Sequence, residues 1–393
     1  MKISCKLSAM TLSLVGLCAF ANAALAQNPE PELDTAVQNG AKHVMQAYAV
    51  PGLAIAVSVN GKQHFYNFGV ASKTTKEPIT PDTLFEVGSI SKVFTVTLAT
   101  YAQAKGLLSL NDTVAKYEPE LQGTPFGKVT LTHLATHTAG GFPLQVPDSV
   151  QNERQLMDYF KAWKPVFPTG TQRSYANPSI GMLGVISAKS MNMPFTQAME
   201  QQLFPALGLN STYLTVPASK MALYAQGYNK QDEPVRLNSG VLGNEAYGVK
   251  TSARDLIHFT ELSLGQGDAS SLVRSALTDT RTGYFRVGPM TQDLIWEQYP
   301  YPVELKSLLV GNSNKMAYEN NDAIALNPPL APQQAVWVNK TGSTGGFGAY
   351  AVFVPSEQKS IVILANKNYP NDARVELAYA ILKALNQVSL RKM

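Results

Sequence analysis

Cysteine is nearly absent from this sequence of 393 residues, in which Cys5 and Cys18 are the only two. Both lie within residues 1–26, which we predict to be removed from the mature protein. The mature chain then has no thiol, and this excludes a disulfide framework and a cysteine-ligated metal site.

Long apolar runs are absent as well, apart from a short one near the N-terminus. Residues 1–26 have a basic start, an apolar core over Thr11–Phe20 and a small-residue site, Ala24-Leu-Ala26. This is the pattern of a cleavable secretory signal, and its apolar core is too short to span a bilayer comfortably. We predict a signal peptide over residues 1–26 that is cleaved after Ala26, with Ala23 as the alternative. The mature protein would then be periplasmic, with no stable membrane anchor after cleavage.

The sequence also lacks a strong net charge of either sign. The formal net charge is +4, and the leader carries two lysines and no acidic residue, which leaves +2 for the mature chain. No basic tract occurs, so nucleic acid is not an expected partner.

Hydrophobic residues make up 45% of the sequence, so a mature chain of about 367 residues can bury a large core. Its length predicts two lobes. We expect a monomer.

The first part of the mature chain predicts a helix followed by a hairpin. Apolar residues recur at helical spacing over Asp34–Tyr48, and Pro51 ends that helix. The run Leu53–Val59, the pair Asn60-Gly61 and the segment His64–Val70 predict a strand, a tight turn and a second strand.

The last part of the chain has the same character. Ala335–Val338, Gly348–Val354 and Ser360–Leu364 are strand-like, and Val375–Leu385 has the spacing of an amphipathic helix. Between the two ends, residues 86 to about 320 consist mostly of helical segments and long loops.

These patterns predict a mixed α/β (α+β) fold. We expect one antiparallel sheet built from both ends of the chain and flanked by the terminal helices, with a mainly helical lobe inserted between them. The approximate boundaries are residues 27–85 and 325–393 for the α/β lobe and residues 86–324 for the helical lobe. The cleft between the lobes is the expected functional site.

Ser89 and Lys92 form the first candidate site. Gly88 and Ser89 begin a predicted helix whose apolar face runs over Val93–Ala104 and which Gly106 ends. Residues three apart share a helix face, so the amine of Lys92 can reach the hydroxyl of Ser89. A serine needs such a base to become a nucleophile, and burial lowers the pKa of an amine toward that role. The N–H groups at the helix start can receive an oxyanion.

The Ser-x-x-Lys pattern is weak by itself, because Ser356-Glu-Gln-Lys359 and Ser389-Leu-Arg-Lys392 match it too. We interpret both of these as solvated surface or terminal residues. Ser89 and Lys92 need further motifs in the right order before they can be interpreted as catalytic.

Two later motifs supply that support. Tyr175-Ala-Asn177 lies in a polar loop before an apolar segment, although Tyr318-Glu-Asn320 shows that the Tyr-x-Asn pattern alone is weak. Lys340-Thr-Gly342 occurs once and leads through a glycine-rich run into the predicted strand Gly348–Val354, so it is much more specific.

In this order, the Ser89, Tyr175 and Lys340 motifs resemble those of the class C serine β-lactamases, the AmpC-type cephalosporinases. Thr136–Gly141 and Leu364–Asn371 add to the resemblance, which covers nearly the whole mature chain. It implies the fold shared by serine β-lactamases and penicillin-binding proteins. It also implies hydrolysis of β-lactam antibiotics, cephalosporins preferred, through a Ser89 acyl-enzyme that water deacylates. No metal or organic cofactor is expected.

The resemblance also implies roles for single residues. Ser89 is the nucleophile, Lys92 and Tyr175 form the proton-transfer network with Lys340 beside them, and the backbone N–H groups of Ser89 and Ser343 form the oxyanion hole. The residues implied to bind the substrate are Gln145, Asn177, Thr341, Gly342, Tyr247, Asn368, Asn371 and Arg374.

Some of these assignments leave two interpretations open. Gln145 and Asn177 match positions that hold the substrate's amide group. Tyr247 either lines the side-chain pocket or is a buried loop aromatic. Arg374 either contacts the substrate carboxylate or only braces the site.

The pKa of Tyr175 needs to fall for this chemistry. A free tyrosine has a pKa of about 10, and one cation about 4 Å away favours the phenolate by roughly 4 kcal/mol, or about three pKa units. With Lys92 and Lys340 on either side, we expect a phenolate near neutrality, against the opposing effect of burial. The sequence leaves open whether Tyr175 or Lys92 is the formal base.

One departure from the family pattern concerns the rim of the expected cleft. Trp296-Glu297 is similar to a family segment at the rim, but Ile295 stands where a glycine is usual. This departure leaves the rim shape, and with it the preferred β-lactams, open.

Rival interpretations use the same acylating machinery. They are a D-alanyl-D-alanine carboxypeptidase, an esterase and a penicillin-binding sensor that acylates without turnover. Lys340-Thr-Gly342 favours the lactamase, since those relatives often carry His or Trp in place of this lysine.

His133 and His137 are spaced like metal ligands, but without a third ligand we expect packing and turn roles for them.

Overall fold

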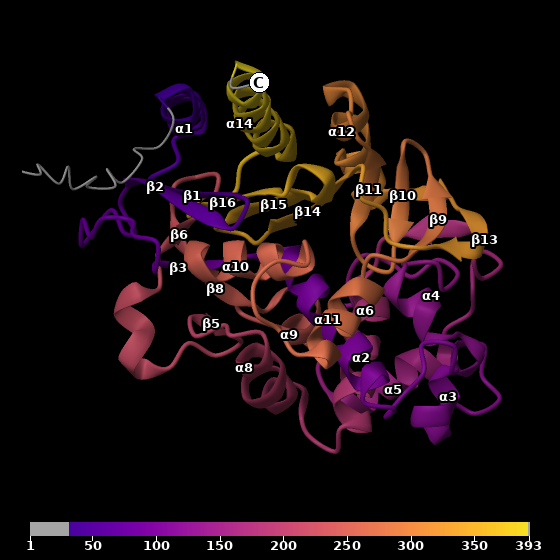
Figure 1. Ribbon diagram of the computed structural model, residues 1–393. Coiled ribbons are helices and arrows are strands. Elements are labelled where there is room, and N and C mark those ends of the chain that lie inside the picture. The colour runs from indigo at the N-terminus through magenta and orange to yellow at the C-terminus, as the bar shows by residue number, and fades with distance from the viewer. Residues whose placement is uncertain (1–30, 392–393) are drawn as a thin grey trace, which may run out of the picture.

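The computed structural model describes residues 31–391, which form a central sheet with helices on both faces (Figure 1). The predicted signal peptide, with both cysteines, lies outside the described residues. Within residues 31–391, no helix is both long and apolar enough to cross a membrane.

The sheet has nine antiparallel strands in the order β13-β9-β10-β11-β14-β15-β16-β1-β2. Its strands are β1 (Gly52–Val59), β2 (Lys62–Gly69), β9 (Gly283–Val287), β10 (Met290–Asp293), β11 (Glu297–Pro300), β13 (Ile324–Leu330), β14 (Val336–Ser343), β15 (Gly348–Val354) and β16 (Lys359–Ala365). Because β1 pairs with β16, the two ends of the chain meet inside one sheet. The predicted mixed α/β fold, with an antiparallel sheet built from both ends of the chain, is confirmed.

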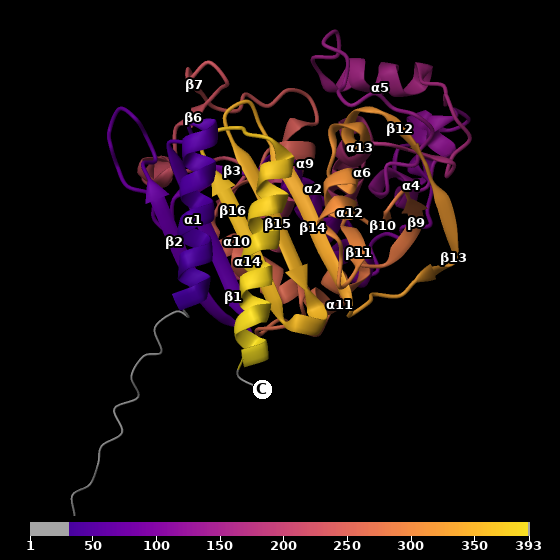
Figure 2. The same cartoon turned by 90° about the horizontal axis from the view of Figure 1, so that it is seen from above.

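The terminal helices cover one face of the sheet. Helices α1 (Pro31–Tyr48) and α14 (Asn371–Arg391) run side by side over it (Figure 2). Helix α10 (Ala253–Ser263) packs on the opposite face, against β1, β15 and β16. The helical lobe continues beyond α10 on this second side (Figure 1).

Strand β1 shows why its sequence is a continuous apolar run. Leu53, Ile55 and Val57 belong to the core under the terminal helices, and Ala54 and Ala56 belong to the core on the α10 side. Successive strand residues point to opposite faces, so a strand buried on both faces has no polar alternation.

The other elements lie mostly in the inserted lobe. Further helices are α2 (Ser91–Ala104), α3 (Val114–Tyr117), α4 (Leu131–Ala135), α5 (Glu153–Ala162), α6 (Asn177–Ser190), α7 (Phe195–Gln197), α8 (Phe204–Ala206), α9 (Gly243–Tyr247), α11 (Ser271–Asp279), α12 (Leu305–Gly311) and α13 (Asn314–Tyr318). Short helical turns are η1 (Gly88–Ile90), η2 (Pro119–Leu121), η3 (Phe126–Lys128), η4 (Ala198–Leu203), η5 (Ala218–Leu223) and η6 (Pro355–Glu357). Small sheets join β3 (Leu84–Glu86), β8 (Lys250–Ser252) and β5 (Thr212–Tyr213), β4 (Gln172–Ser174) with β12 (Asn320–Asp322), and β6 (Gly227–Tyr228) with β7 (Pro234–Val235).

The predicted hairpin has the expected turn. Asn60 has φ 51° and Gly61 has φ 78°, and Val59 pairs with Lys62 across them. Two consecutive residues with positive φ are what a two-residue hairpin turn requires, and Asn-Gly supplies them at little cost.

Strand β14 runs farther than the sequence predicted. It continues to Ser343, so Lys340, Thr341 and Gly342 lie in the sheet, hydrogen-bonded to β15. The rigid sheet therefore presents this motif at one end of a strand.

Strands β9, β10 and β11 lie in the range that was expected to be mainly helical, and they extend the central sheet instead. For β10 and β11 the reason is that polar side chains occupy buried positions. Gln292, Asp293, Glu297 and Gln298 are all buried, so the apolar period that indicates a strand is missing.

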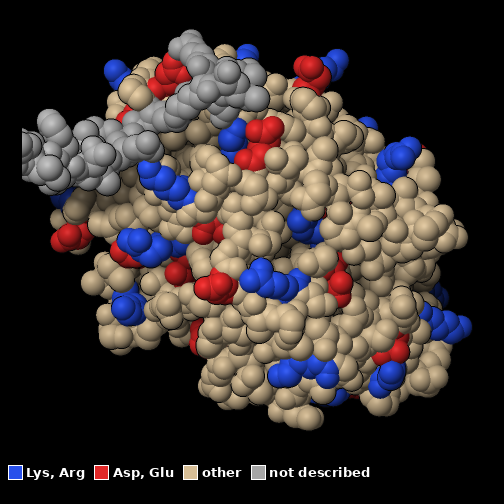
Figure 3. All heavy atoms as spheres, in the orientation of Figure 1, with Lys and Arg blue, Asp and Glu red and all other residues tan. Residues whose placement is uncertain are grey.

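The surface has no strong field of one sign on the face in Figure 3. Among the described residues, basic and acidic side chains are interspersed there, with hollows between them. This distribution agrees with the near-neutral net charge.

Candidate active site

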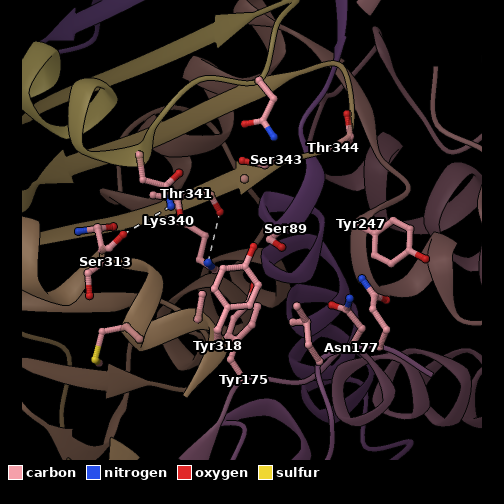
Figure 4. Close-up of a pocket in the computed structure, with 18 of the residues that line it drawn as sticks. Ser89, Tyr175, Asn177, Tyr247, Ser313, Tyr318, Lys340, Thr341, Ser343 and Thr344 are labelled. Carbon is pink, nitrogen blue, oxygen red and sulfur yellow. Dashed lines mark hydrogen bonds between the residues drawn. The ribbon is translucent and has the colours of Figure 1, made fainter. Parts of the chain in front are cut away.

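A cleft of about 510 Å³ opens beside the end of β14. Its lining includes all the predicted site residues except Lys92 and Arg374: Ser89, Gln145, Tyr175, Asn177, Tyr247, Lys340, Thr341, Gly342, Ser343, Asn368 and Asn371. Figure 4 shows how side chains from both lobes converge on this cavity. Residues that are far apart in the sequence are thus brought together.

Ser89 lies in the turn η1, between β3 and α2, with its side chain partly accessible. Gly88 has φ 50°, and a Cβ atom there would collide with the backbone of Ser343. A Cβ atom on Gly342 would in turn collide with the carbonyl oxygen of Val87 and lie 3.1 Å from the backbone nitrogen of Ser89. The two glycines therefore let the turn that carries Ser89 pack backbone to backbone against β14.

Lys92 lies directly behind Ser89. Its Nζ donates to Ser89 Oγ at 3.0 Å and to the carbonyl oxygen of Ala246 at 2.9 Å. Burial lowers the pKa of Lys92 to about 8, against the opposing effect of Tyr175. A largely desolvated amine in contact with the hydroxyl can accept its proton near neutral pH.

Tyr175 lies between two lysines. Lys92 Nζ is 5.0 Å and Lys340 Nζ is 5.1 Å from the centre of its ring. Burial raises the pKa of Tyr175, but the charges of Lys340 and Lys92 outweigh it and lower the pKa to about 8. The hydroxyl has no hydrogen-bond partner of good geometry among the described residues. It therefore stays available for a proton from the reaction.

Lys340 and Tyr175 have a second set of buried charges beneath them. Glu297 Oε1 lies 3.7 Å from Lys340 Nζ and accepts from Arg173 Nη2 at 3.0 Å. The guanidinium of Arg173 also lies 5.2 Å from the centre of the Tyr175 ring. Glu297 thus balances two cations and orients them, a role that the sequence did not reveal.

The segment Trp296-Glu297, similar to a family segment at the cleft rim, reaches the cleft with only one of its two residues. Ile295 and Trp296 are both 1% exposed, and Trp296 packs against Phe259 and Phe353 in the core rather than at the rim. Only Glu297 of this segment lines the cleft. The departure at Ile295 therefore acts on core packing and not directly on the rim.

The pH dependence of the rate tests this electrostatic arrangement. Loss of one proton from the Lys92–Tyr175 pair, with pKa values of about 8, is expected to activate the site, so kcat/KM should rise as pH rises through that value. The charge of Lys340 lowers both pKa values. Lys340→Met should therefore move this rise to higher pH, by roughly one unit.

Lys340→Arg is the matched control, because it keeps the positive charge. Measured between about pH 6 and about pH 10, kcat/KM of Lys340→Arg should rise at nearly the same pH as that of the unmodified enzyme. An unmoved pH profile in Lys340→Met would show that this charge does not control the pair.

The opposite side of the cleft carries amide groups. Asn177, at the start of α6, is held by a hydrogen bond from its backbone N–H to the carbonyl oxygen of Leu144 at 2.8 Å. Its Oδ1 is buried without a partner among the described residues, and the side chain of Gln145 is exposed beside it. Tyr247 is half-buried on α9 and lines the same cavity, so it is not a fully buried loop aromatic.

Arg374 lies behind the cleft wall and does not line the cavity. It is completely buried and donates to the carbonyl oxygen of Gly342 at 2.7 Å, to Ser343 Oγ at 2.9 Å and to Asn368 Oδ1 at 2.8 Å. Asn371 lines the cleft, and its Nδ2 approaches the carbonyl oxygen of Asn312 at 3.5 Å. Of the two interpretations of Arg374, these contacts favour the bracing role.

The two histidines have separate contacts. His133 Nδ1 is 2.7 Å from Thr138 Oγ1, and His137 Nδ1 accepts from the backbone N–H of Ala176 at 3.2 Å. The His137 ring lies 4.4 Å from that of Tyr175, and burial holds the pKa of His137 well below its usual range. In the described part of the chain, no three His, Cys, Asp or Glu residues are grouped to hold a metal ion.

This geometry combines a serine hydroxyl in contact with an amine, groups of shifted pKa and backbone amides. Lys92 and Tyr175 can exchange a proton with Ser89, and the backbone beside Ser89 and Ser343 can receive the negative charge of a tetrahedral intermediate. The fold and the cleft together define a serine hydrolase that works by acyl transfer.

The comparisons with known proteins identify the family. The β-lactamase family model matches residues 37–386. The β-lactamase of Lysobacter lactamgenus is 50% identical over 374 residues, which cover 94% of this chain and 97% of that protein. The chain therefore belongs to the β-lactamase family.

Two solved structures identify the class. A β-lactamase/D-alanine carboxypeptidase from Pseudomonas syringae is 62% identical with a TM-score of 0.88, over 89% of this chain and 98% of that one. A class C β-lactamase in complex with cefoxitin is 49% identical, also with a TM-score of 0.88, over 90% of this chain and 99% of that one. The protein is a class C serine β-lactamase, as its motifs predicted.

Proposed function

We propose that Ser89 of this β-lactamase opens the ring of β-lactams, cephalosporins preferentially, to form an acyl-enzyme that water then hydrolyses. The observation that carries the proposal is the contact of Ser89 Oγ with Lys92 Nζ at 3.0 Å, beside Tyr175, whose pKa is lowered to about 8. Among the described residues that line the cleft, Ser89 is the one serine whose hydroxyl contacts a lysine amine.

In acylation, Ser89 Oγ attacks the lactam carbonyl carbon while its proton passes to the Lys92–Tyr175 pair. The carbonyl oxygen becomes an oxyanion that accepts hydrogen bonds from the backbone N–H groups of Ser89 and Ser343. The C–N bond of the ring then breaks, and the nitrogen takes a proton from the same pair. The product is an ester on Ser89.

In deacylation, the pair takes a proton from water, whose oxygen attacks the ester carbon. The ester bond breaks, Ser89 Oγ regains the proton, and a carboxylic acid leaves. Asn177 and Gln145 would hold the substrate's amide, and Lys340, Thr341, Asn368 and Asn371 would surround its carboxylate. Arg374 would support Gly342 and Ser343 from behind.

We also propose that the protein works as a periplasmic monomer after removal of residues 1–26, without a stable membrane anchor. The basic start, the apolar core Thr11–Phe20 and the site Ala24-Leu-Ala26 support export. Mass spectrometry of protein from the periplasm tests this, and a mass that starts at Gln27 is expected. A mass that includes residues 1–26 would contradict it.

Chelation should leave the rate unchanged. Every proposed step uses side chains and backbone groups, so no metal or organic cofactor is required. After dialysis against EDTA, the enzyme should retain its full rate, within about twofold. A loss that zinc restores would contradict the metal-free mechanism.

The central experiment measures hydrolysis of a chromogenic cephalosporin by the mature protein, followed by mass spectrometry after mixing. Many turnovers with at most a transient adduct on Ser89 are expected. A single burst and a persistent adduct would favour a carboxypeptidase or sensor, and no adduct would favour an esterase. The carboxypeptidase is a specific alternative because the solved relative with 62% identity carries both names.

A further inference from the structure

Glu86 is a buried carboxylate that the proposed mechanism does not use. It ends β3, three residues before Ser89, and is 1% exposed. Its Oε1 accepts from the hydroxyl of Tyr224 at 2.5 Å and from the backbone N–H of Leu237 at 2.7 Å. Its Oε2 is buried without a partner in the described chain. Lys250, opposite Glu86 on β8, balances part of its charge. The carboxylate still has few hydrogen-bond donors for a buried group, which points to a role beyond packing.

The two groups that Glu86 holds differ in their other support. Tyr224 is stabilised independently, because the adjacent Ala225 N–H donates to the carbonyl oxygen of Leu84 and the guanidinium of Arg236 stacks on the Tyr224 ring at 4.2 Å. Losing the phenol–carboxylate bond should therefore leave Tyr224 in place.

Leu237 has less support of its own, although the preceding residue is held in place. The Arg236 guanidinium donates to the carbonyl oxygens of Tyr224 at 2.6 Å and Ala225 at 3.3 Å. Residues 237–241 connect β7 to α9, are half-buried or exposed, and form no strand or helix. Their other backbone hydrogen bond in the described structure is local, from Gly243 N–H to the carbonyl oxygen of Gly240. At the far end of the segment, Val241 packs against the core. Between Arg236 and Val241, the bond to Glu86 is the hydrogen bond that fixes the backbone of Leu237 beside Asn238.

The segment matters because it forms a wall of the catalytic cleft. Leu237 and Asn238 line the cavity that holds Ser89, Tyr175 and Tyr247. Glu86 therefore connects the wall directly to the strand that leads into the nucleophile turn. A shift of the wall would change the width of the cleft without moving Ser89 or its bases.

We propose that Glu86 is a positioning residue that determines which acyl side chains the cleft accepts, by holding the wall at Leu237 and Asn238 at a set distance from Ser89. This inference rests on the proposed function, because it concerns the side chain of the substrate acylating Ser89. Without the carboxylate the wall moves outward, which admits bulkier acyl groups and weakens the contact with compact ones.

Glu86→Met tests the proposal, since methionine has a similar volume and no strong acceptor. The measurement is kcat and KM for two cephalosporins, one with a compact and one with a large branched acyl group. The ratio of kcat/KM, bulky over compact, should rise about tenfold through KM, the effect of one lost charge-assisted hydrogen bond. The kcat for the compact substrate should stay within about threefold, since the catalytic groups do not move.

Two matched variants separate the anchor from general stability. Glu86→Gln keeps a carbonyl acceptor for the Leu237 N–H and should retain the original ratio. Tyr224→Phe removes the other donor of the same carboxylate and should also retain it. An unchanged ratio in Glu86→Met, an equal loss on both substrates, or a loss of selectivity in Tyr224→Phe would overturn the proposal.

Hydrogen exchange keeps the test valid if Glu86→Met does not fold. In the unmodified enzyme, the Leu237 amide should exchange much more slowly than the neighbouring amides of Asn238 and Ser239. If the Leu237 amide exchanged as fast as the amides of an open loop, its hydrogen bond to Glu86 would not hold the wall, and the proposal would be overturned. If the enzyme hydrolysed no β-lactam while this amide was protected, the proposed function would fail and the anchor would stand.

Discussion

Ser89→Ala should abolish β-lactam turnover while leaving the fold intact. Without Oγ no acyl-enzyme can form, and removal of a serine nucleophile lowers kcat by roughly 10⁵-fold or more. The structural cost is small, because Lys92 keeps its hydrogen bond to the carbonyl oxygen of Ala246. The free energy of unfolding should change by about 1 kcal/mol or less, as measured by thermal or urea unfolding.

The sequence contains a matched control for this variant. Ser356 lies in a second Ser-x-x-Lys pattern, Ser356-Glu-Gln-Lys359, and is exposed in the turn that follows β15. Lys359 is buried at the start of β16, so the interpretation of this lysine as a solvated residue was wrong. Ser356→Ala should hydrolyse cephalosporins at the normal rate. Normal turnover by Ser89→Ala would contradict the assignment of Ser89 as the nucleophile. If Ser89→Ala does not fold, mass spectrometry of the adduct on the unmodified enzyme decides the question instead.

The sequence predicted the parts of the site that short motifs define. Ser89 and Lys92 share one turn of chain, so their contact follows from local geometry alone. The three residues from Lys340 to Gly342 occupy one strand end, and Gly342 is required there by its close approach to Val87. Such features need no knowledge of distant partners.

The charges beneath the site could not be predicted in the same way. Arg173 and Glu297 are 124 residues apart and meet only because β4 and β11 fold against the same cleft. Each looks like an ordinary surface charge in the sequence. Asn339 shows the same difficulty, because its buried amide contacts Asn312 and Glu297 from a position between apolar residues and the Lys340 motif.

The sheet itself was predicted where its strands are apolar on both faces. Strands β1, β15 and β16 carry runs of buried aliphatic residues, and their ranges were predicted to within about two residues. Strand β11, with buried Glu297 and Gln298, was missed because its hydrogen-bonded polar side chains hide the apolar pattern. Where polar and charged side chains are buried beneath the site, the apolar sequence pattern that predicts a strand is therefore lost.

Tyr175→Phe addresses the question that the sequence left open, which residue is the formal base. The hydroxyl makes no hydrogen bond of good geometry in the described structure, and the ring stays packed between Lys92 and Lys340, so the fold should be unchanged. If Tyr175 carries the proton, kcat/KM should fall by about 10²- to 10⁴-fold, the usual contribution of a positioned acid or base. We expect this result, since the two lysines favour its phenolate.

The pH profile of Tyr175→Phe distinguishes the alternative. Tyr175 raises the pKa of Lys92, so removing the phenol should lower that pKa below its present value of about 8. If Lys92 is the base, the variant should keep most of its activity, and its rate should rise at lower pH than in the unmodified enzyme. Tyr318→Phe removes a hydroxyl from the other Tyr-x-Asn pattern, 70% exposed at the cleft, and should change the rate by less than about threefold. A large loss confined to Tyr175→Phe would therefore assign the proton to Tyr175, and a small loss with the shifted profile would assign it to Lys92.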